Sequence, residues 1–142
     1  MSELKGRILS IDYGLKRVGL ALSDPMQIIS SPYKALQNTP ELKELIVDII
    51  ISEDVTEVII GLPVREDGTP SEIYDEVKKF KVSLEEDLDI PVKEVDERYS
   101  SSIAKERMII TTPGKKKRRD KNLIDILSAQ ILLEDYLNGK TG

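Results

Sequence analysis

One stretch decides the fold of this chain: Asp12-Tyr13-Gly14-Leu15-Lys16-Arg17-Val18-Gly19. An apolar segment, 7–11, leads into it, and a second apolar segment, 18–22, leaves it. Two such segments around a short turn predict a β-hairpin, with Gly14 supplying a positive φ in the turn. Asp12 then stands alone at the tip of an apolar strand. Two interpretations fit it: a metal or phosphate site at the strand end, or an Asx turn in which the carboxylate bonds only nearby backbone N–H groups.

The composition predicts one globular domain over residues 1–142. The chain is 39% hydrophobic and 33% charged, which is typical of a folded domain with a real core. It has no apolar run of bilayer length and no signal-peptide pattern at its start, so we expect a cytoplasmic protein without a membrane partner. Zero Cys and zero His exclude thiol nucleophiles, disulfides, imidazole bases and ordinary zinc sites. Any catalysis must therefore use carboxylates, Lys, Arg, hydroxyls, backbone groups and metal-activated water.

The net charge of −5 argues against a general nucleic-acid-binding surface, but the charge is unevenly distributed. The segment 115–121 (Lys-Lys-Lys-Arg-Arg-Asp-Lys) carries six bases and one acid, or +5, which leaves −10 for the remainder of the chain. A solvated loop explains such a run in the simplest way. Its predicted place, next to the last helix, favours a phosphate-binding arm with a log–log salt slope of about −3 to −4.

The order of the predicted elements indicates an α/β fold. After the hairpin we expect a third strand over 28–36, at an edge or with a bulge because of Pro32. A helix over 40–53, a strand over 57–60, a helix from Ser71 to Asp87 and a strand over 91–97 follow. A helix over 100–110, a loop over 111–121 and a last helix over 122–138 complete the chain. This order is that of the ribonuclease H-like fold: a mixed five-stranded sheet that begins with a three-strand antiparallel meander and has helices on both faces.

Besides Asp12, two further acidic positions interrupt apolar surroundings. In the strand over 91–97, the period of two sends Asp96 and Arg98 to one face and Glu97 to the other, so only one of the two acids serves a given site. A salt bridge with Arg98 is the structural alternative for Asp96. Three carboxylates that converge from separate elements suit Mg²⁺ or Mn²⁺, and two such ions activate a water and stabilise the leaving oxygen in phosphodiester cleavage.

Asp125 is the third acid. The helical period aligns it with Ala129, Leu132 and Tyr136, so its stripe faces inward, where a carboxylate needs a partner or a metal. The competing interpretation is helix capping, with Asn122 as the N-cap and Asp125 as the N3 acid.

Four motifs, in this order, resemble the YqgF family, a bacterial family described as Holliday-junction-resolvase-like and linked to pre-16S rRNA processing. The resemblance extends from about residue 7 to residue 137. The motifs are 11–19 (Ile-Asp-Tyr-Gly-Leu-Lys-Arg-Val-Gly), Gly61-Leu62-Pro63 followed by Asp67-Gly68-Thr69, 96–101 (Asp-Glu-Arg-Tyr-Ser-Ser), and Ile124-Asp125 followed by Ala129 and 131–134 (Ile-Leu-Leu-Glu).

The resemblance implies a ribonuclease H-like endonuclease that processes the 5′ end of the 16S rRNA precursor in ribosome biogenesis. Its catalytic and metal-binding acids would be Asp12, Glu97 and Asp125, with Asp96 in reserve and Mg or Mn as the cofactor. Arg65 stands where the family usually has Asn, and an arginine there adds a phosphate contact.

The basic side chains near these acids are the candidate nucleic-acid contacts. With only six aromatic residues, we expect recognition through the backbone and shape of structured RNA or branched DNA rather than through base stacking. For Lys16 and Arg17, a position on the hairpin rim is an equal alternative. The candidates are Lys16, Arg17, Arg65, Arg98, Lys115, Lys116, Lys117, Arg118, Arg119 and Lys121.

Other functions remain open on the residues alone. A resolvase of four-way DNA junctions shares the same site, and as a homodimer it would make two symmetric cuts, whereas an RNA-processing enzyme can be a monomer. A phosphotransfer domain of the actin and sugar-kinase type also carries an Asp and a Gly in its first hairpin, but 142 residues leave no room for a second lobe. The last alternative is a catalytically silent nucleic-acid-binding module whose acids serve only the fold.

Overall fold

The computed structural model describes residues 5–63, 69, 71–96 and 121–141. The predicted helix over 100–110 and residues 111–120 of the predicted loop over 111–121 lie outside these residues, whereas Lys121 belongs to the last helix rather than to a loop. Within them, the elements follow the predicted order: β1 (Arg7–Tyr13), β2 (Arg17–Ser23), β3 (Ser30–Gln37), α1 (Leu42–Ser52), β4 (Val55–Leu62), α2 (Tyr74–Asp87), β5 (Val92–Asp96) and α5 (Lys121–Thr141).

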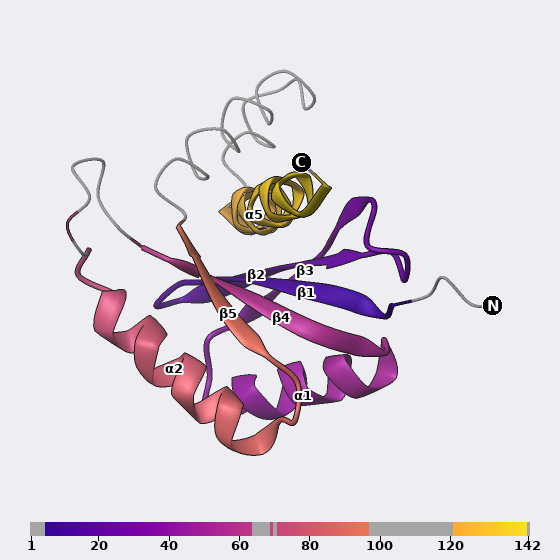
Figure 1. The fold of residues 1–142 in the computed structure, drawn as a ribbon. Helices are drawn as coiled ribbons and strands as arrows, with labels where there is room; N and C mark the ends of the chain where they lie inside the picture. The colour runs from indigo at the N-terminus through magenta and orange to yellow at the C-terminus, as the bar shows by residue number, and fades with distance from the viewer. Residues whose placement is uncertain (1–4, 64–68, 70, 97–120, 142) are drawn as a thin grey trace.

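The five strands form one mixed sheet with the order β3-β2-β1-β4-β5 (Figure 1). β1 pairs antiparallel with β2, and β2 pairs antiparallel with β3. β4 and β5 continue the sheet on the other side of β1 as parallel strands. The antiparallel meander and the mixed five-stranded sheet predicted from the sequence are therefore confirmed.

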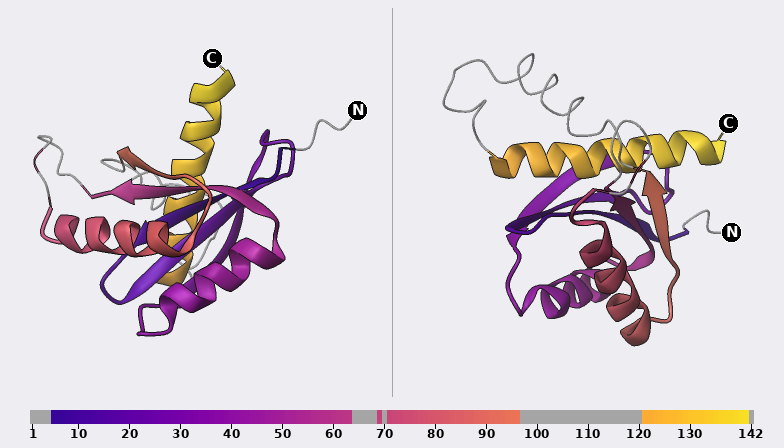
Figure 2. Two further views of the ribbon diagram at one scale, coloured as in Figure 1. Left: turned by 60° about the horizontal axis from the view of Figure 1, so that its bottom comes forward. Right: turned by 90° about the vertical axis from the view of Figure 1, so that its left-hand side faces the viewer.

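Helices cover both faces of the sheet (Figure 2). α1 and α2 lie on one face, and α5 crosses the other. Side chains of the central strands point alternately to the two faces of the sheet. Leu9 and Ile11 pack towards α1 and α2, whereas Ile8 packs towards Leu133 of α5. In the part of the chain that the structure describes, no helix is long and apolar enough to cross a membrane.

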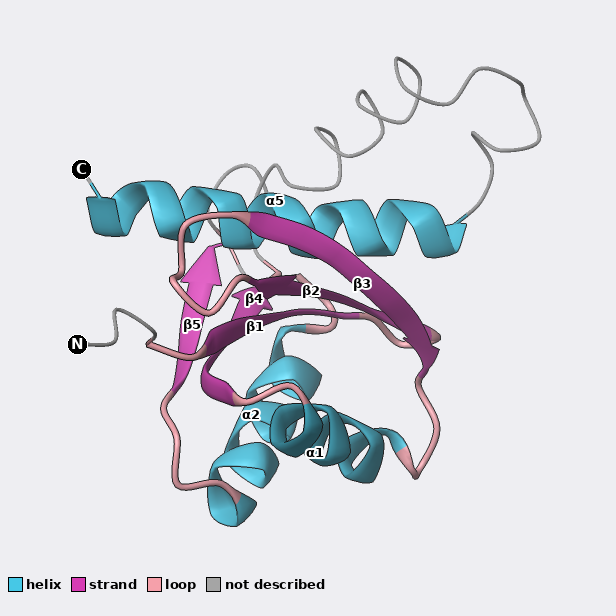
Figure 3. Ribbon diagram, turned by 90° about the vertical axis from the view of Figure 1, so that its right-hand side faces the viewer, coloured by secondary structure: helices cyan, strands magenta, loops and turns pink. Residues whose placement is uncertain are grey.

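β3 is an edge strand, as Pro32 predicted (Figure 3). Leu20 pairs with Lys34 and Ala21 pairs with Pro32, so the register skips Tyr33 at a bulge. Proline cannot donate a ladder hydrogen bond, and the bulge at an outer strand accommodates it.

Two local predictions are wrong. Gly14 has no positive φ; among the described glycines only Gly6 does. The last pair of the hairpin is Tyr13 with Val18, and the four-residue loop between them does not need the left-handed conformation that a two-residue turn requires. Gly14 serves instead to leave room, because a Cβ there would press on the carbonyl oxygen of Arg17.

The start of α2 also differs from the prediction. The helix begins at Tyr74, three residues after Ser71, and no side chain caps it. The Ser71 N–H donates to the Pro63 carbonyl, and the Tyr74 N–H donates to the Ser71 carbonyl. Ser71 is thus tied to the end of β4 through its backbone, in a turn that precedes the helix.

Candidate active site

Asp12 lies in β1, one residue before its end, on the face of the sheet that α5 covers. Two residues earlier, Ser10 points to α5, because its hydroxyl donates to the Ala129 carbonyl at 2.7 Å. The intervening Ile11 belongs to the core under α1 and α2. Side chains alternate along a strand, so Asp12 shares the α5 face with Ser10. Asp12 is partly exposed.

Asp125 of α5 lies directly over the strand position opposite Asp12. Gly19 of β2 is the Cα partner of Asp12, and a Cβ on Gly19 would clash with the carbonyl oxygen of Asp125. Only a glycine allows α5 to approach the sheet this closely. Gly19 therefore brings Asp12 and Asp125, which are far apart in the sequence, to one place.

The capping interpretation of Asp125 is wrong. α5 begins at Lys121, so Asn122 lies inside the helix and Asp125 lies beyond its first three residues. The inward-facing stripe is confirmed, since Ala129 is fully buried and Leu132 is 4% exposed.

The carboxylate of Asp125 has a cationic partner. Arg17 Nε donates to Asp125 Oδ2 at 2.9 Å, and both side chains are about one-quarter exposed (26% and 24%). From the sequence, Arg17 was expected either to lie on the rim of the hairpin or to bind a phosphate of the nucleic acid. The structure shows that Arg17 contacts a candidate catalytic acid. The register of the hairpin could have indicated this contact. Arg17 lies two residues before Gly19, so its side chain lies on the side of β2 that α5 approaches.

The hairpin loop that carries Lys16 and Arg17 is braced by Asn38. The Asn38 side-chain amide donates to the Gly14 carbonyl at 2.7 Å, and its backbone N–H donates to the Lys16 carbonyl at 2.9 Å. A pocket of about 560 Å³ opens between this loop, residues 71–73 before α2, and Asp125. The two cations of the loop, Lys16 and Arg17, both line it.

The third predicted acid, Glu97, lies outside the described residues, directly after Asp96 at the end of β5. In β5, Lys93 and Val95 face α5, because Lys93 bonds to Tyr136 and Val95 packs with the apolar cluster under α5. Glu94 faces α2, where it pairs with Lys78 at 2.7 Å. Asp96 is exposed at this strand end and also borders a pocket beside Leu132 of α5.

The residues present fit a magnesium-type ion. Carboxylate oxygens are the ligands that Mg²⁺ and Mn²⁺ prefer. Because these ions retain several waters, two protein carboxylates can supply part of the coordination shell of one ion. Among the described residues, no group of three acidic side chains gathers at one point.

Most of the predicted nucleic-acid contacts lie outside the described residues. These are Arg65, Arg98, Lys115, Lys116, Lys117, Arg118 and Arg119, together with the side chain of Lys121.

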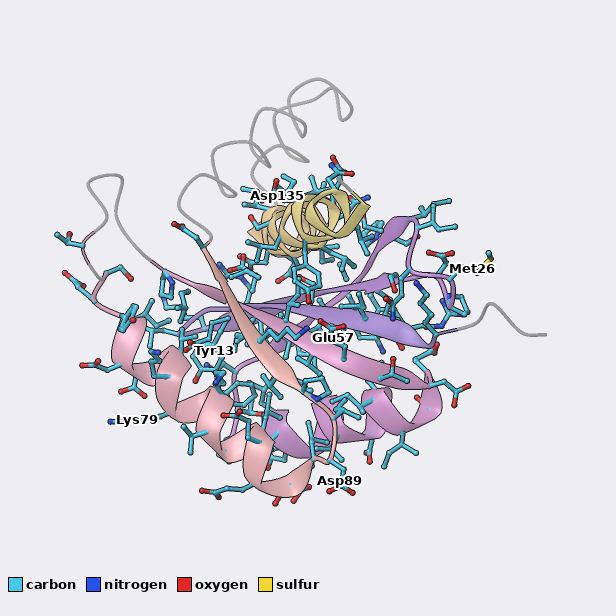
Figure 4. All side chains as sticks on the ribbon, viewed as in Figure 1. Tyr13, Met26, Glu57, Lys79, Asp89 and Asp135 are labelled. Carbon is cyan, nitrogen blue, oxygen red and sulfur yellow. The ribbon has the colours of Figure 1, made fainter. Side chains whose placement is uncertain are left out.

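A second polar cluster, which sequence reasoning missed, ties the other end of α5 to the sheet (Figure 4 labels Glu57). The Tyr136 hydroxyl donates to Glu57 Oε2, and Lys93 Nζ lies 3.1 Å from the same oxygen. Burial and the bond to Glu57 raise the pKa of the Tyr136 phenol. The hydrogen bond to Tyr136, followed by the contact with Glu57, raises the pKa of the Lys93 ammonium. This cluster anchors the helix that carries Asp125.

Comparison with known proteins identifies the family of this chain. Residues 6–139 match the family model RuvX, described as "Holliday junction resolvase". The chain belongs to the RuvX family. This is the family named YqgF in the sequence analysis, so that resemblance is confirmed. RuvX proteins are nucleases, and membership supports a hydrolase that acts on phosphodiester bonds rather than a phosphotransfer domain.

Named relatives cover almost the whole chain. A protein of Christiangramia forsetii is 41% identical over 132 residues, which are 92% of this chain and 97% of the relative. A protein of Bacteroides fragilis is 42% identical over 135 residues, with coverage of 94% and 97%. Both carry the name "Putative pre-16S rRNA nuclease".

Solved structures support the ribonuclease H-like architecture. Thermus thermophilus RuvC, in complex with a Holliday junction substrate, aligns with a TM-score of 0.59 at 13% identity and covers 96% of each chain. The fowlpox virus resolvase, with its Holliday junction DNA, aligns with a TM-score of 0.62 at 12% identity and covers 96% of this chain and 99% of its own. At these identities the likeness establishes the fold.

Proposed function

We propose that this RuvX protein is a metal-dependent endonuclease that processes the 5′ end of pre-16S rRNA. The observation that carries the proposal is the close approach of the Asp125 backbone to Gly19, the strand partner of Asp12, on the α5 face of the sheet. The names of the relatives supply the substrate class. A cytoplasmic location follows from this role.

The acids Asp12, Asp125 and Glu97 would hold Mg²⁺ or Mn²⁺, with Asp96 in reserve. The alternation in β5 supports Glu97 as the third ligand. Lys93 and Val95 face α5, and the sequence pattern predicts that Glu97 shares their side of the strand. The bound ion supplies activation of water and neutralisation of charge on the phosphate.

The chain's own residues would bind and orient the substrate. Lys16 lies on the hairpin loop, and the basic segment 115–121 precedes or enters α5, which carries Asp125. Their positive charges attract phosphate groups to a chain that is otherwise acidic. Arg65 and Arg98 are further phosphate contacts in this proposal.

A cleavage assay tests the proposal. Labelled pre-16S RNA is incubated with the protein in Mg²⁺, Mn²⁺ or EDTA, alongside Asp12→Asn and the control Asp48→Asn, which changes an exposed carboxylate on α1. We expect metal-dependent cleavage that Asp12→Asn abolishes and Asp48→Asn retains. Equal cleavage by wild type and Asp12→Asn would refute the role of Asp12; binding without cleavage in both would indicate a silent binding module.

The description of the family model favours a second candidate, a DNA junction resolvase. A four-way junction included in the same assay separates the two candidates. Two symmetric cuts require two active sites, so this function also requires a homodimer on the junction, whereas RNA trimming is compatible with a monomer.

A further inference from the structure

Arg17 forms an ion pair with the carboxylate of Asp125, which is a proposed ligand of the cation. Its Nε bonds directly to Asp125 Oδ2, and both side chains are about three-quarters buried, where charges are less screened than on an open surface. An arginine at this oxygen opposes a nearby divalent cation in two ways: it occupies a ligand atom, and it adds a like charge.

The guanidinium also has a place to move to. Arg17 lines the pocket between the hairpin loop and residues 71–73, beside Lys16. Lys16 is exposed, and no ion pair holds its ammonium among the residues that the structure describes. Turned away from Asp125, the guanidinium would join Lys16. The pocket would then have two cations beside the carboxylate of Glu72, which also lines it, next to the proposed cleavage site. A phosphate group fits such a pair, because arginine binds phosphate oxygens through two parallel N–H donors.

We propose that a divalent cation displaces Arg17 from Asp125, and that the released guanidinium, together with Lys16, binds a phosphate of the substrate strand in this pocket. The inference rests on the proposed function. It makes Arg17 a positioning residue that links metal loading to substrate binding. Cation and nucleic acid then strengthen each other's binding, because each favours the arrangement in which Arg17 has left Asp125.

Cation affinity without nucleic acid tests the exchange. Mn²⁺ is titrated calorimetrically into wild type, Arg17→Gln and Lys16→Gln. The two variants remove the same charge from adjacent residues, but only Arg17→Gln removes the ion pair. We expect Arg17→Gln to bind Mn²⁺ about threefold to tenfold more tightly than wild type, and Lys16→Gln to change the affinity less than about twofold. A urea unfolding curve of each variant confirms that it folds.

Substrate binding tests the second half of the proposal. In EDTA, where Arg17 stays on Asp125, Lys16→Gln weakens binding of a pre-16S RNA fragment more than Arg17→Gln does. With the metal present, both variants raise KM for its cleavage. A structural role for Arg17 does not produce this dependence on metal.

The contrary outcomes are distinct. Equal Mn²⁺ affinities in the two variants, or weaker binding in Arg17→Gln, overturn the exchange and leave the nuclease proposal intact. A wild type that binds no Mn²⁺ at all contradicts the metal site itself, and with it the proposed function.

Discussion

Asp12 and Gly19 are partners across the β1–β2 hairpin, and α5 touches the sheet at Gly19 with the backbone of Asp125. The absence of a side chain at residue 19 is therefore what lets the backbone of Asp125 lie over the strand pair that contains Asp12.

Gly19→Ala will push α5 away from the sheet at the site. The added Cβ meets backbone atoms of Asp125, which cannot move independently of the helix. We expect a loss of about 1–3 kcal/mol in the free energy of unfolding, as for an overpacked core, and loss of cleavage. The matched control is Gly139→Ala in α5, where a Cβ meets nothing within 4 Å and raises helix propensity. Urea unfolding and cleavage of pre-16S RNA are measured on both; wild-type values for Gly19→Ala would contradict the close approach.

Ser10→Ala will loosen α5 one turn beyond Asp125. The fully buried hydroxyl donates to the Ala129 carbonyl, and its removal should lower the free energy of unfolding by about 1 kcal/mol. Ser31→Ala, at an exposed position of β3, is the control. A change no larger than that of the control would show that this hydrogen bond does not anchor the helix.

Stability should fall at alkaline pH through the cluster of Glu57, Lys93 and Tyr136. The pKa values of Tyr136 and Lys93 are both raised in the folded state, so the protonated forms stabilise it. This contribution is complete below pH 10, the ordinary pKa of tyrosine, and is lost as the pH rises through the raised values. Tyr136→Phe removes the phenol, so its stability should fall less steeply above pH 10. Urea unfolding at pH 8 and above pH 10 measures this difference, and parallel curves for the two proteins would refute it.

The basic segment 115–121 should set the salt dependence of substrate binding. Replacing Lys115, Lys116 and Lys117 by Gln should reduce the log–log salt slope by about 2 to 3, if each lysine neutralises one phosphate. The control is Lys79→Gln, on the outer side of α2, across the sheet from α5 (Figure 4). Fluorescence anisotropy at several salt concentrations gives the slopes; an unchanged slope in the triple variant would mean that the segment is only a solvated loop.

The sequence predicted the sheet well because its strands have a clear pattern. Apolar runs on both sides of the hairpin, and Pro32 in the third strand, determine pairing through local chemistry. The boundaries were less certain: α2 begins at Tyr74 rather than Ser71, since the backbone of Ser71 is tied to Pro63, a tertiary contact that no local signal shows.

The candidate site was predicted only in part. The inward stripe of α5 indicated that Asp125 faces the sheet, but the sequence does not give the crossing point of α5 on it. For this reason the roles of Gly19 and Ser10 and the contact of Arg17 with Asp125 were missed. The capping interpretation was wrong because it assumed a later start of α5. The helix begins at Lys121, so Asp125 does not occupy the capping position within the first turn.

The most direct test of a metal site at Asp12 and Asp125 is to locate the bound cation. Mn²⁺ is paramagnetic and broadens the NMR signals of nearby nuclei. It is titrated into the ¹⁵N-labelled wild type and into the variants Asp12→Asn and Asp125→Asn. The control is Asp135→Asn, at an exposed position of α5 (Figure 4). We expect the amide signals of Asp12, Gly19 and Asp125 to broaden first in wild type and Asp135→Asn, while those of Met26 and Lys79 persist. In Asp12→Asn and in Asp125→Asn, the same broadening should require a Mn²⁺ concentration at least about tenfold higher. Broadening centred elsewhere, or equal in all four proteins, would contradict a metal site built on Asp12 and Asp125.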